Sequence, residues 1–295
     1  MDISLALGGG GARGYAHIGV LRRLEQEGYK IQAVAGTSAG GIIAAVYAAG
    51  FSPDEMEARF AKIDQSKLFG RLAKDGPGLL GLSGAVKVLE EVLGDRTFKD
   101  LRIPCAFTAV DIRSANEVVL CEGRVLDAVL ATIALPGIFP PKEFKEYQLV
   151  DGAVLDPVPV SVARMLAPNL PVVAVILNSP ARVRTDILQI PLPIPVPSPI
   201  IERLFHTRIA QAFGIFLQSV DIGSRKLAEL RLRDDDPEAI IRPEVGDIGV
   251  LDTVDLHHVV RLGEEAVNLI LPDLKRATSW TTRIRRKIFP SPHRY

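Results

Sequence analysis

The fold is decided by residues 31–49, which read IQAVAGTSAGGIIAAVYAA. This stretch opens with an apolar run of strand length, Ile31–Ala35, and closes with a helix-forming run of small residues, Ala39–Ala49. Between the two runs, Gly36-Thr37-Ser38-Ala39-Gly40 places small residues on both sides of a serine, which permits a sharp turn from strand to helix. Such a turn would lift the Ser38 hydroxyl out of the sheet and over a helix N-terminus. In that position the hydroxyl could act as a nucleophile.

The same strand–turn–helix order occurs upstream, as a strand at Ile3–Leu7, a tight loop at Gly8–Gly14 and a helix at Tyr15–Glu27. Further strands are expected at Ile103–Val110, Val118–Leu120, Tyr147–Val150 and Pro171–Leu177, and further helices at Val86–Leu93, Val125–Leu135, residues 202–232 and Asp255–Ile270. Alternation of short buried strands with helices predicts a three-layer α/β/α fold with a mostly parallel central sheet. The active site should lie at the C-terminal ends of the first two strands.

Composition narrows the class of protein. The 295 residues are 47% hydrophobic, and Lys+Arg equals Asp+Glu at 35 each, so no global charge directs the chain to nucleic acid. The two cysteines form neither a disulfide framework nor a metal-binding pattern. The N-terminal run reads as a strand and not as a signal peptide, and no apolar run reaches the roughly 18 residues of a membrane span. We therefore expect a cytoplasmic protein with one domain, residues 1–275, and a basic tail, residues 276–295.

The loop Gly8-Gly-Gly-Gly-Ala-Arg13-Gly14 can turn several backbone N–H groups toward one point, because glycine has no Cβ. At a helix N-terminus that point suits either a phosphate or the oxyanion of an acyl transfer reaction. Gly9-x-Gly11-x-x-Gly14 matches a dinucleotide fingerprint, but the second strand ends in Ala35-Gly36-Thr37-Ser38, without the acid that would hold a ribose. A nucleotide- or anion-binding module therefore remains the weaker alternative.

A serine nucleophile needs a base. The order Ser…Asp…His of α/β-hydrolases would make His257 or His258 that base, yet their helical surroundings favour a surface or packing role. The other candidate is Asp151, which a strand delivers to the turn at Gly152, so that its carboxylate is exposed at the strand end.

Taken together, the three motifs resemble those of the bacterial patatin-like phospholipases. That family carries Gly-Gly-Gly-x-Arg-Gly, then Gly-x-Ser-x-Gly, then a distal Asp-Gly-Ala or Asp-Gly-Gly, and this chain has Gly9–Gly14, Gly36–Gly40 and Asp151–Ala153 in that order. Two further stretches look like the family, Ala16–Leu21 and the proline block Ala134–Pro141. The resemblance covers roughly residues 1–180. Departures are small: Gly8 stands where relatives often have serine or aspartate, and Thr132-Ile133 replaces a serine-containing pair.

The resemblance implies a Ser38–Asp151 dyad without histidine, an oxyanion hole of backbone amides, and no metal or cofactor. The amides would come from Gly9, Gly10 and Gly11, and the supporting motif residues would be Arg13, Gly14, Gly36, Ala39, Gly40 and Gly152. Arg13 would either anchor the glycine loop or meet a phosphate headgroup.

The implied reaction is hydrolysis of acyl esters in phospholipids, lysophospholipids or glycerides, and acyl transfer to an alcohol is the alternative that uses the same acyl-enzyme. The uncharged, proline-rich stretch Ile187–Ile201 would either pack over the core or at a homodimer contact, or act as a flap toward lipid. Lys275–Tyr295 holds seven Lys or Arg and no acid, which favours peripheral binding to anionic membranes.

Overall fold

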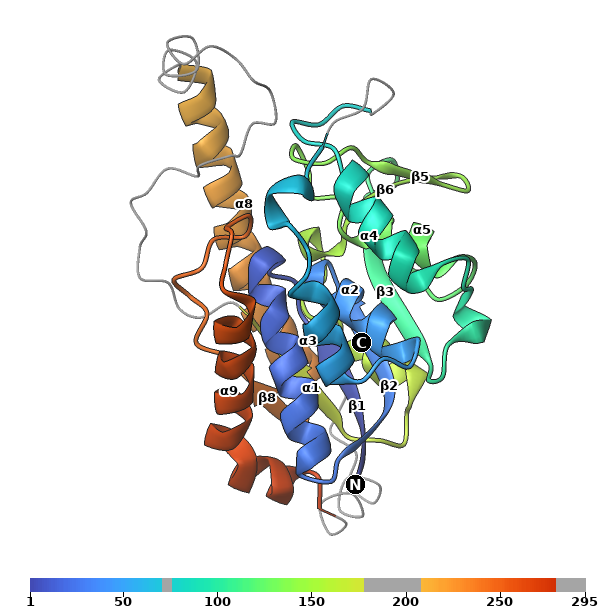
Figure 1. Ribbon diagram of the computed structural model, residues 1–295, viewed down its shortest axis with the longest axis vertical. Coiled ribbons are helices and arrows are strands. Elements are labelled where there is room, and N and C mark those ends of the chain that lie inside the picture. The colour runs from blue at the N-terminus through green and yellow to red at the C-terminus, as the bar shows by residue number, and fades with distance from the viewer. Residues whose placement is uncertain (71–75, 178–207, 280–295) are drawn as a thin grey trace.

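A computed structural model describes residues 1–70, 76–177 and 208–279. The proline-rich stretch 187–201 and residues 280–295 of the basic tail lie outside the described residues. The elements follow one another as strand–helix units in the first half of the chain, and two long helices dominate the second half (Figure 1).

One sheet organises the domain, with strand order β5-β6-β3-β2-β1-β7-β8 and β4 paired to β3. Its strands are β1 (Asp2–Leu7), β2 (Lys30–Thr37), β3 (Cys105–Asp111), β4 (Asn116–Leu120), β5 (Lys142–Phe144), β6 (Tyr147–Asp151), β7 (Val172–Val175) and β8 (Ala239–Ile241). The central run β3-β2-β1-β7-β8 is parallel throughout, whereas β4, β5 and β6 pair antiparallel at one side. The expected mostly parallel sheet is confirmed.

Helices cover both faces of this sheet, as expected (Figure 1). The larger group comprises α1 (Ala16–Gln26), α2 (Ala39–Ala48), α3 (Pro53–Phe60), α4 (Ser83–Leu93), α5 (Val125–Thr132) and α9 (Leu256–Ala277). The opposite face is covered by α6 (Val160–Leu166) and by α8 (Arg208–Asp235), which packs on α6. Short 3-10 helices occur at η1 (Gly11–Tyr15), η2 (Gln65–Lys67), η3 (Phe98–Asp100) and η4 (Gly152–Val154).

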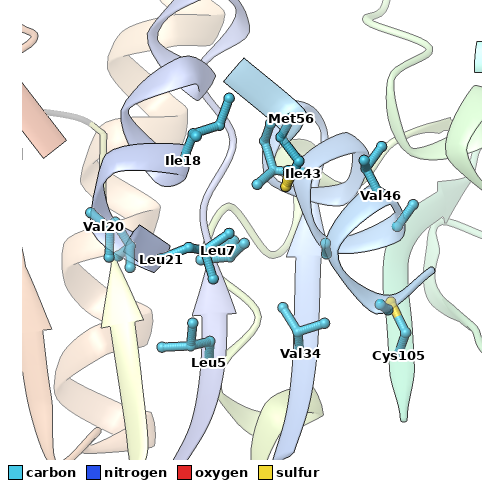
Figure 2. Packing of buried hydrophobic residues seen from close by; sticks show 14 of the residues in the cluster. Leu5, Leu7, Ile18, Val20, Leu21, Val34, Ile43, Val46, Met56 and Cys105 are labelled. Carbon is cyan, nitrogen blue, oxygen red and sulfur yellow. The ribbon is translucent and has the colours of Figure 1, made fainter. Parts of the chain in front are cut away.

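Alternation along the strands separates the two cores. Leu5 and Leu7 of β1 belong to the larger cluster, where they pack with Ile18 and Leu21 of α1 and Ile43 of α2 (Figure 2). Alanines that point the other way pack with the buried valines of α6; these are Ala6, Ala35 and Ala106. Small side chains on this second face allow a short helix to approach the sheet closely, and large ones on the first face fill the space beneath several helices.

Most helices and strands lie where short patterns in the sequence predict them. Helix α3 begins at a local sequence signal, since Ser52 and Glu55 form a reciprocal capping box with Pro53 in the first turn. The predicted helix Val125–Leu135 is too long: α5 ends at Thr132, and the Ala134 carbonyl instead accepts the Asp151 N–H at 2.9 Å. Strands β5 and β8 and helix α6 were not predicted. Helix α9 continues through Pro272 to Ala277, past the expected start of the basic tail.

Within the described parts of the chain, no helix combines the length and the apolar character that crossing a bilayer requires.

Candidate active site

Ser38 lies at the turn between β2 and α2 in a conformation that few side chains adopt, with φ 54° and ψ −124°. A non-glycine residue in this region costs on the order of 1–3 kcal/mol, so the surrounding structure must impose it. The flanking glycines make the turn sterically feasible. A Cβ at Gly36 would lie 2.5 Å from the Gly40 carbonyl oxygen, and one at Gly40 would lie 2.1 Å from that of Leu7.

Asp151 meets Ser38 at this turn. The Ser38 side chain interacts with the Asp151 carboxylate and lowers its pKa, and the Ala153 N–H donates a hydrogen bond to Oδ1 of Asp151 at 2.9 Å. Strand β6 runs antiparallel to β3, and Asp151 is paired with Ala109, one residue beyond the Thr108 that pairs with Thr37. The acid therefore arrives from the direction opposite to the nucleophile. Sequence reasoning placed the acid at a strand end but did not predict this direction.

Burial governs the electrostatics of Asp151, which is only 2% exposed. Desolvation raises the pKa of its carboxyl to about 6, against the hydrogen bonds from Ser38 and the Ala153 amide, which lower it. At neutral pH the carboxylate is still mostly ionised, and its pKa is close enough to the working pH for efficient proton transfer in both directions.

The glycine loop lies beside the serine, since a Cβ on Gly9 would be 3.2 Å from the Ser38 Cβ. The Gly9 N–H, however, already donates to the Pro157 carbonyl at 3.0 Å. Gly10 and Gly11, in contrast, donate to no carbonyl of the described residues. The Gly9 amide is therefore not available as expected, because it secures the loop to the segment after Asp151, whereas no described residue accepts the Gly10 and Gly11 amides.

The other end of this loop is fixed to the 248–250 segment. Gly11 has φ +57°, and a Cβ there would lie 2.0 Å from the Val250 carbonyl oxygen, which accepts the Ala12 N–H at 2.9 Å. Only glycine combines this conformation with this contact.

Arg13 holds the glycine loop in place through buried contacts, and the residue is only 4% exposed. Its Nε donates to the Ile248 carbonyl at 2.6 Å, and its guanidinium lies 3.9 Å from the Asp221 carboxylate on α8. These contacts favour the anchoring role over contact with a headgroup. At Gly14 and Gly152 the neighbouring elements lie too close for a side chain. A Cβ on Gly14 would lie 2.6 Å from the Ala39 Cβ, and one on Gly152 would lie 2.3 Å from Oγ1 of Thr108.

Two residues near the site escaped sequence reasoning. His17 is fully buried, and its Nε2 is 2.8 Å from the Gly8 carbonyl oxygen. Burial lowers the pKa of His17 to about 4, so the neutral ring donates this bond and steadies the start of the glycine loop. Thr132 accepts the Ser38 N–H through Oγ1 at 2.9 Å. The only feature of the sequence that singled out Thr132 is that Thr132-Ile133 stands where the resembled family has a serine-containing pair.

The histidines considered as alternative bases lie elsewhere. His257 Nδ1 is 2.5 Å from a carboxylate oxygen of Glu57 on α3, and both His257 and His258 begin α9 as exposed residues. Neither has a hydrogen bond to Ser38 or Asp151 among the described contacts.

A search of the described residues finds no group of three or more His, Cys, Asp or Glu side chains that could hold a metal ion. Cys105 and Cys121 are both free thiols, the first buried and the second exposed.

Comparison with known proteins places this arrangement in a family. A relative from Mycobacterium tuberculosis, described as an uncharacterized NTE family protein, is 38% identical over 162 residues, which is 54% of this chain and 44% of the relative. The human patatin-like phospholipase domain-containing protein 6 is 34% identical over 171 residues, covering 56% of this chain and 12% of that protein. The chain thus spans less than half the length of these relatives.

Among solved structures, VipD from Legionella pneumophila aligns with 93% of this chain and 67% of its own, at a TM-score of 0.49 and 12% identity. The family model described as patatin-like phospholipase matches residues 5–164, which is more than half of the chain and includes all three motifs. The chain therefore belongs to the patatin-like phospholipase family, a family of lipid acyl hydrolases.

Proposed function

We propose that the chain hydrolyses acyl ester bonds in phospholipids, lysophospholipids or glycerides, with Ser38 as nucleophile and Asp151 as base. The observation that carries this proposal is the interaction of the Ser38 side chain with the buried Asp151 carboxylate, beside a loop whose Gly10 and Gly11 amides donate to none of the described residues.

The reaction follows from this geometry. Ser38 Oγ attacks the acyl carbonyl carbon while its proton passes to Asp151, and the Gly10 and Gly11 amides bind the oxyanion that forms. Each such donor typically contributes about 3 kcal/mol to the transition state. Asp151 then gives the proton to the departing alcohol, which leaves an acyl ester on Ser38. A water molecule attacks this ester while Asp151 takes its proton; the bond to Ser38 Oγ then breaks, Asp151 returns the proton to Oγ, and the fatty acid leaves.

An apolar cluster beside the site supports a lipid substrate. It consists of Leu80, Ile138, Phe139, Phe69, Leu82, Leu135 and Leu251. Leu135 follows Ala134, whose carbonyl accepts the Asp151 N–H. Leu251 follows Val250, whose carbonyl accepts the Ala12 N–H of the glycine loop. The cluster therefore adjoins both halves of the site, where an acyl chain would find apolar surface.

Peripheral contact with an anionic membrane is part of this proposal. Ile215, Phe216 and Ile222 of α8 are 65%, 49% and 67% exposed, and the first half of this helix projects beyond the rest of the domain (Figure 1). Exposed apolar residues of this kind suit the boundary between headgroups and acyl chains. Because residues Lys275–Tyr295 include seven Lys or Arg and no acid, binding to vesicles should rise with anionic lipid and fall with salt. Equal binding to neutral and anionic vesicles would contradict the electrostatic part of the proposal.

Hydrolysis of a short p-nitrophenyl ester tests the dyad. Ser38→Ala and Asp151→Asn should each lower kcat by several orders of magnitude, because a covalent mechanism loses its nucleophile or its base. Asp111→Asn is the matched control, since Asp111 is another buried carboxylate at a strand end that accepts a serine hydroxyl, that of Ser114 at 2.6 Å. It should keep its activity per folded molecule. More than a few per cent of activity in Ser38→Ala would refute the assignment.

A further inference from the structure

Three buried threonines lie behind the dyad and connect the elements that carry it. Thr37 ends β2, Thr108 lies in β3 and Thr132 ends α5, and none of the three is exposed. Thr37 Oγ1 is 2.6 Å from Thr108 Oγ1 and 2.9 Å from the Asp156 carbonyl oxygen. Thr132 Oγ1 is 2.6 Å from the Thr108 carbonyl oxygen and 2.9 Å from the Ser38 nitrogen. Together they link the nucleophile turn to β3 and to the segment after Asp151.

The direction of each bond follows from what the partners can donate. A carbonyl only accepts, so Thr132 gives its hydroxyl hydrogen to the Thr108 carbonyl and uses a lone pair for the Ser38 N–H. Thr37 likewise gives its hydrogen to the Asp156 carbonyl, so the hydroxyl of Thr108 donates to Thr37. All three hydroxyl hydrogens are used. The network can therefore hold the backbone in place but has no free proton to offer to the reaction.

Ser38 is held from both sides of its Cα. Its N–H is bound by Thr132, and its carbonyl accepts the Gly41 N–H at 2.8 Å and the Ile42 N–H at 3.2 Å. The carbonyl bonds belong to the first turn of α2, so any helix start would supply them. The bond to the N–H comes from a side chain on a different helix. A relaxation of φ away from 54° would separate the N–H from Thr132, and this partly buried N–H would lose its partner.

We propose that Thr132 is a positioning residue, whose hydroxyl fixes the Ser38 N–H and with it the left-handed conformation that directs Oγ toward Asp151. This inference rests on the proposed function of Ser38. The hydroxyl, and not the shape of the side chain, is the feature that matters, because it must accept one bond and donate another at the same time.

Thr132→Val and Thr132→Ser separate these two features. Valine keeps the branched shape but can neither accept from Ser38 nor donate to Thr108, whereas serine keeps the hydroxyl. We expect kcat for a p-nitrophenyl ester to fall about 100-fold in Thr132→Val with KM unchanged, since a misplacement of about 1 Å costs that much in rate. The rate of Ser38 labelling by a fluorophosphonate should fall in parallel. Thr132→Ser should retain nearly full kcat.

Thr278→Val is the matched control, because Thr278 is equally buried and its hydroxyl donates to the Leu274 carbonyl at 2.7 Å, at the end of α9. It should leave kcat unchanged. If Thr132→Val does not fold, the pair Thr132→Ala and Thr132→Ser makes the same comparison without a bulky replacement. Equal kcat in the variants with and without the hydroxyl would overturn the inference and leave the dyad intact. Full activity in Ser38→Ala would instead overturn the proposed function.

Discussion

Replacement of Asp156 by asparagine should stabilise the protein at neutral and alkaline pH. Asp156 has no exposed surface, and its carboxyl oxygens make no well-aligned hydrogen bond among the described residues; the nearby Val158 amide lowers the pKa only weakly against burial. Burial raises the pKa of this carboxyl to about 7; repulsion from Glu117 and Asp235 adds to the shift, and Arg231 of α8 opposes it. The folded protein therefore holds the ionised form of Asp156 at a cost.

The size and sign of this cost follow from the linkage between protonation and folding. A carboxyl whose pKa is raised on folding destabilises the folded state as pH rises above the unfolded value of 3.8, and the loss is complete above about 7. The rise of this pKa from 3.8 to about 7 corresponds to about 4 kcal/mol of folding free energy. Asparagine removes the charge, so Asp156→Asn should raise the midpoint of thermal unfolding by about 10 °C at pH 8.

Thermal unfolding followed by circular dichroism between pH 4 and pH 8 measures this effect. The gain in Tm should shrink as pH falls from 7 and become small at pH 4, where Asp156 is protonated in the folded state and nearly half protonated in the unfolded chain. Esterase activity should be retained, because Thr37 binds the backbone carbonyl of Asp156 and not its side chain. Asp111→Asn provides the opposite case: bonds from Ser114 and the Gln148 amide lower the pKa of Asp111 to about 2, so that variant should lose stability at neutral pH. A gain for Asp156→Asn that is equal at pH 4 and pH 8, or a loss at pH 8, would refute the reasoning.

Three further predictions concern the site. The pH dependence of kcat/KM should show activity falling below about pH 6, because Asp151 with its pKa of about 6 must be ionised to accept a proton; a rate independent of pH between 5 and 7 would argue against this base. Gly11→Ala should nearly abolish activity because its Cβ would lie 2.0 Å from the Val250 oxygen, whereas Gly94→Ala, at a nearly identical φ of +58° but with nothing within 4 Å, should only lower Tm. His257→Ala should keep kcat within about twofold, since His257 contacts Glu57 on α3 and not the dyad. A loss of kcat as large as that of Asp151→Asn would instead support a Ser–Asp–His triad with His257 as base.

Local chemistry explains what could be predicted from the sequence. Strand, turn and helix around Ser38 follow from an apolar run, two glycines and a run of alanines, all within twenty residues, and the cap of α3 follows from Ser52, Pro53 and Glu55. The family resemblance adds Asp151, which no local rule connects to Ser38 across more than one hundred residues. Each of these features depends on neighbours in sequence or on a motif, so a reader of the sequence alone can find them.

The remaining features depend on which segments meet in space, and only the tertiary structure decides that. Strand β6 pairs antiparallel with β3 through a register that no sequence pattern of five residues specifies, and this register sets Asp151 against Ser38. The Gly9 amide is engaged because Pro157 happens to lie beside it, and Thr132 supports Ser38 because α5 ends at the tip of β2. The pKa of Asp151 rises because folding buries its carboxyl. Hydrogen bonds and desolvation act over a few ångströms of space, whatever the separation along the chain, and so the chemistry of this site is settled by packing.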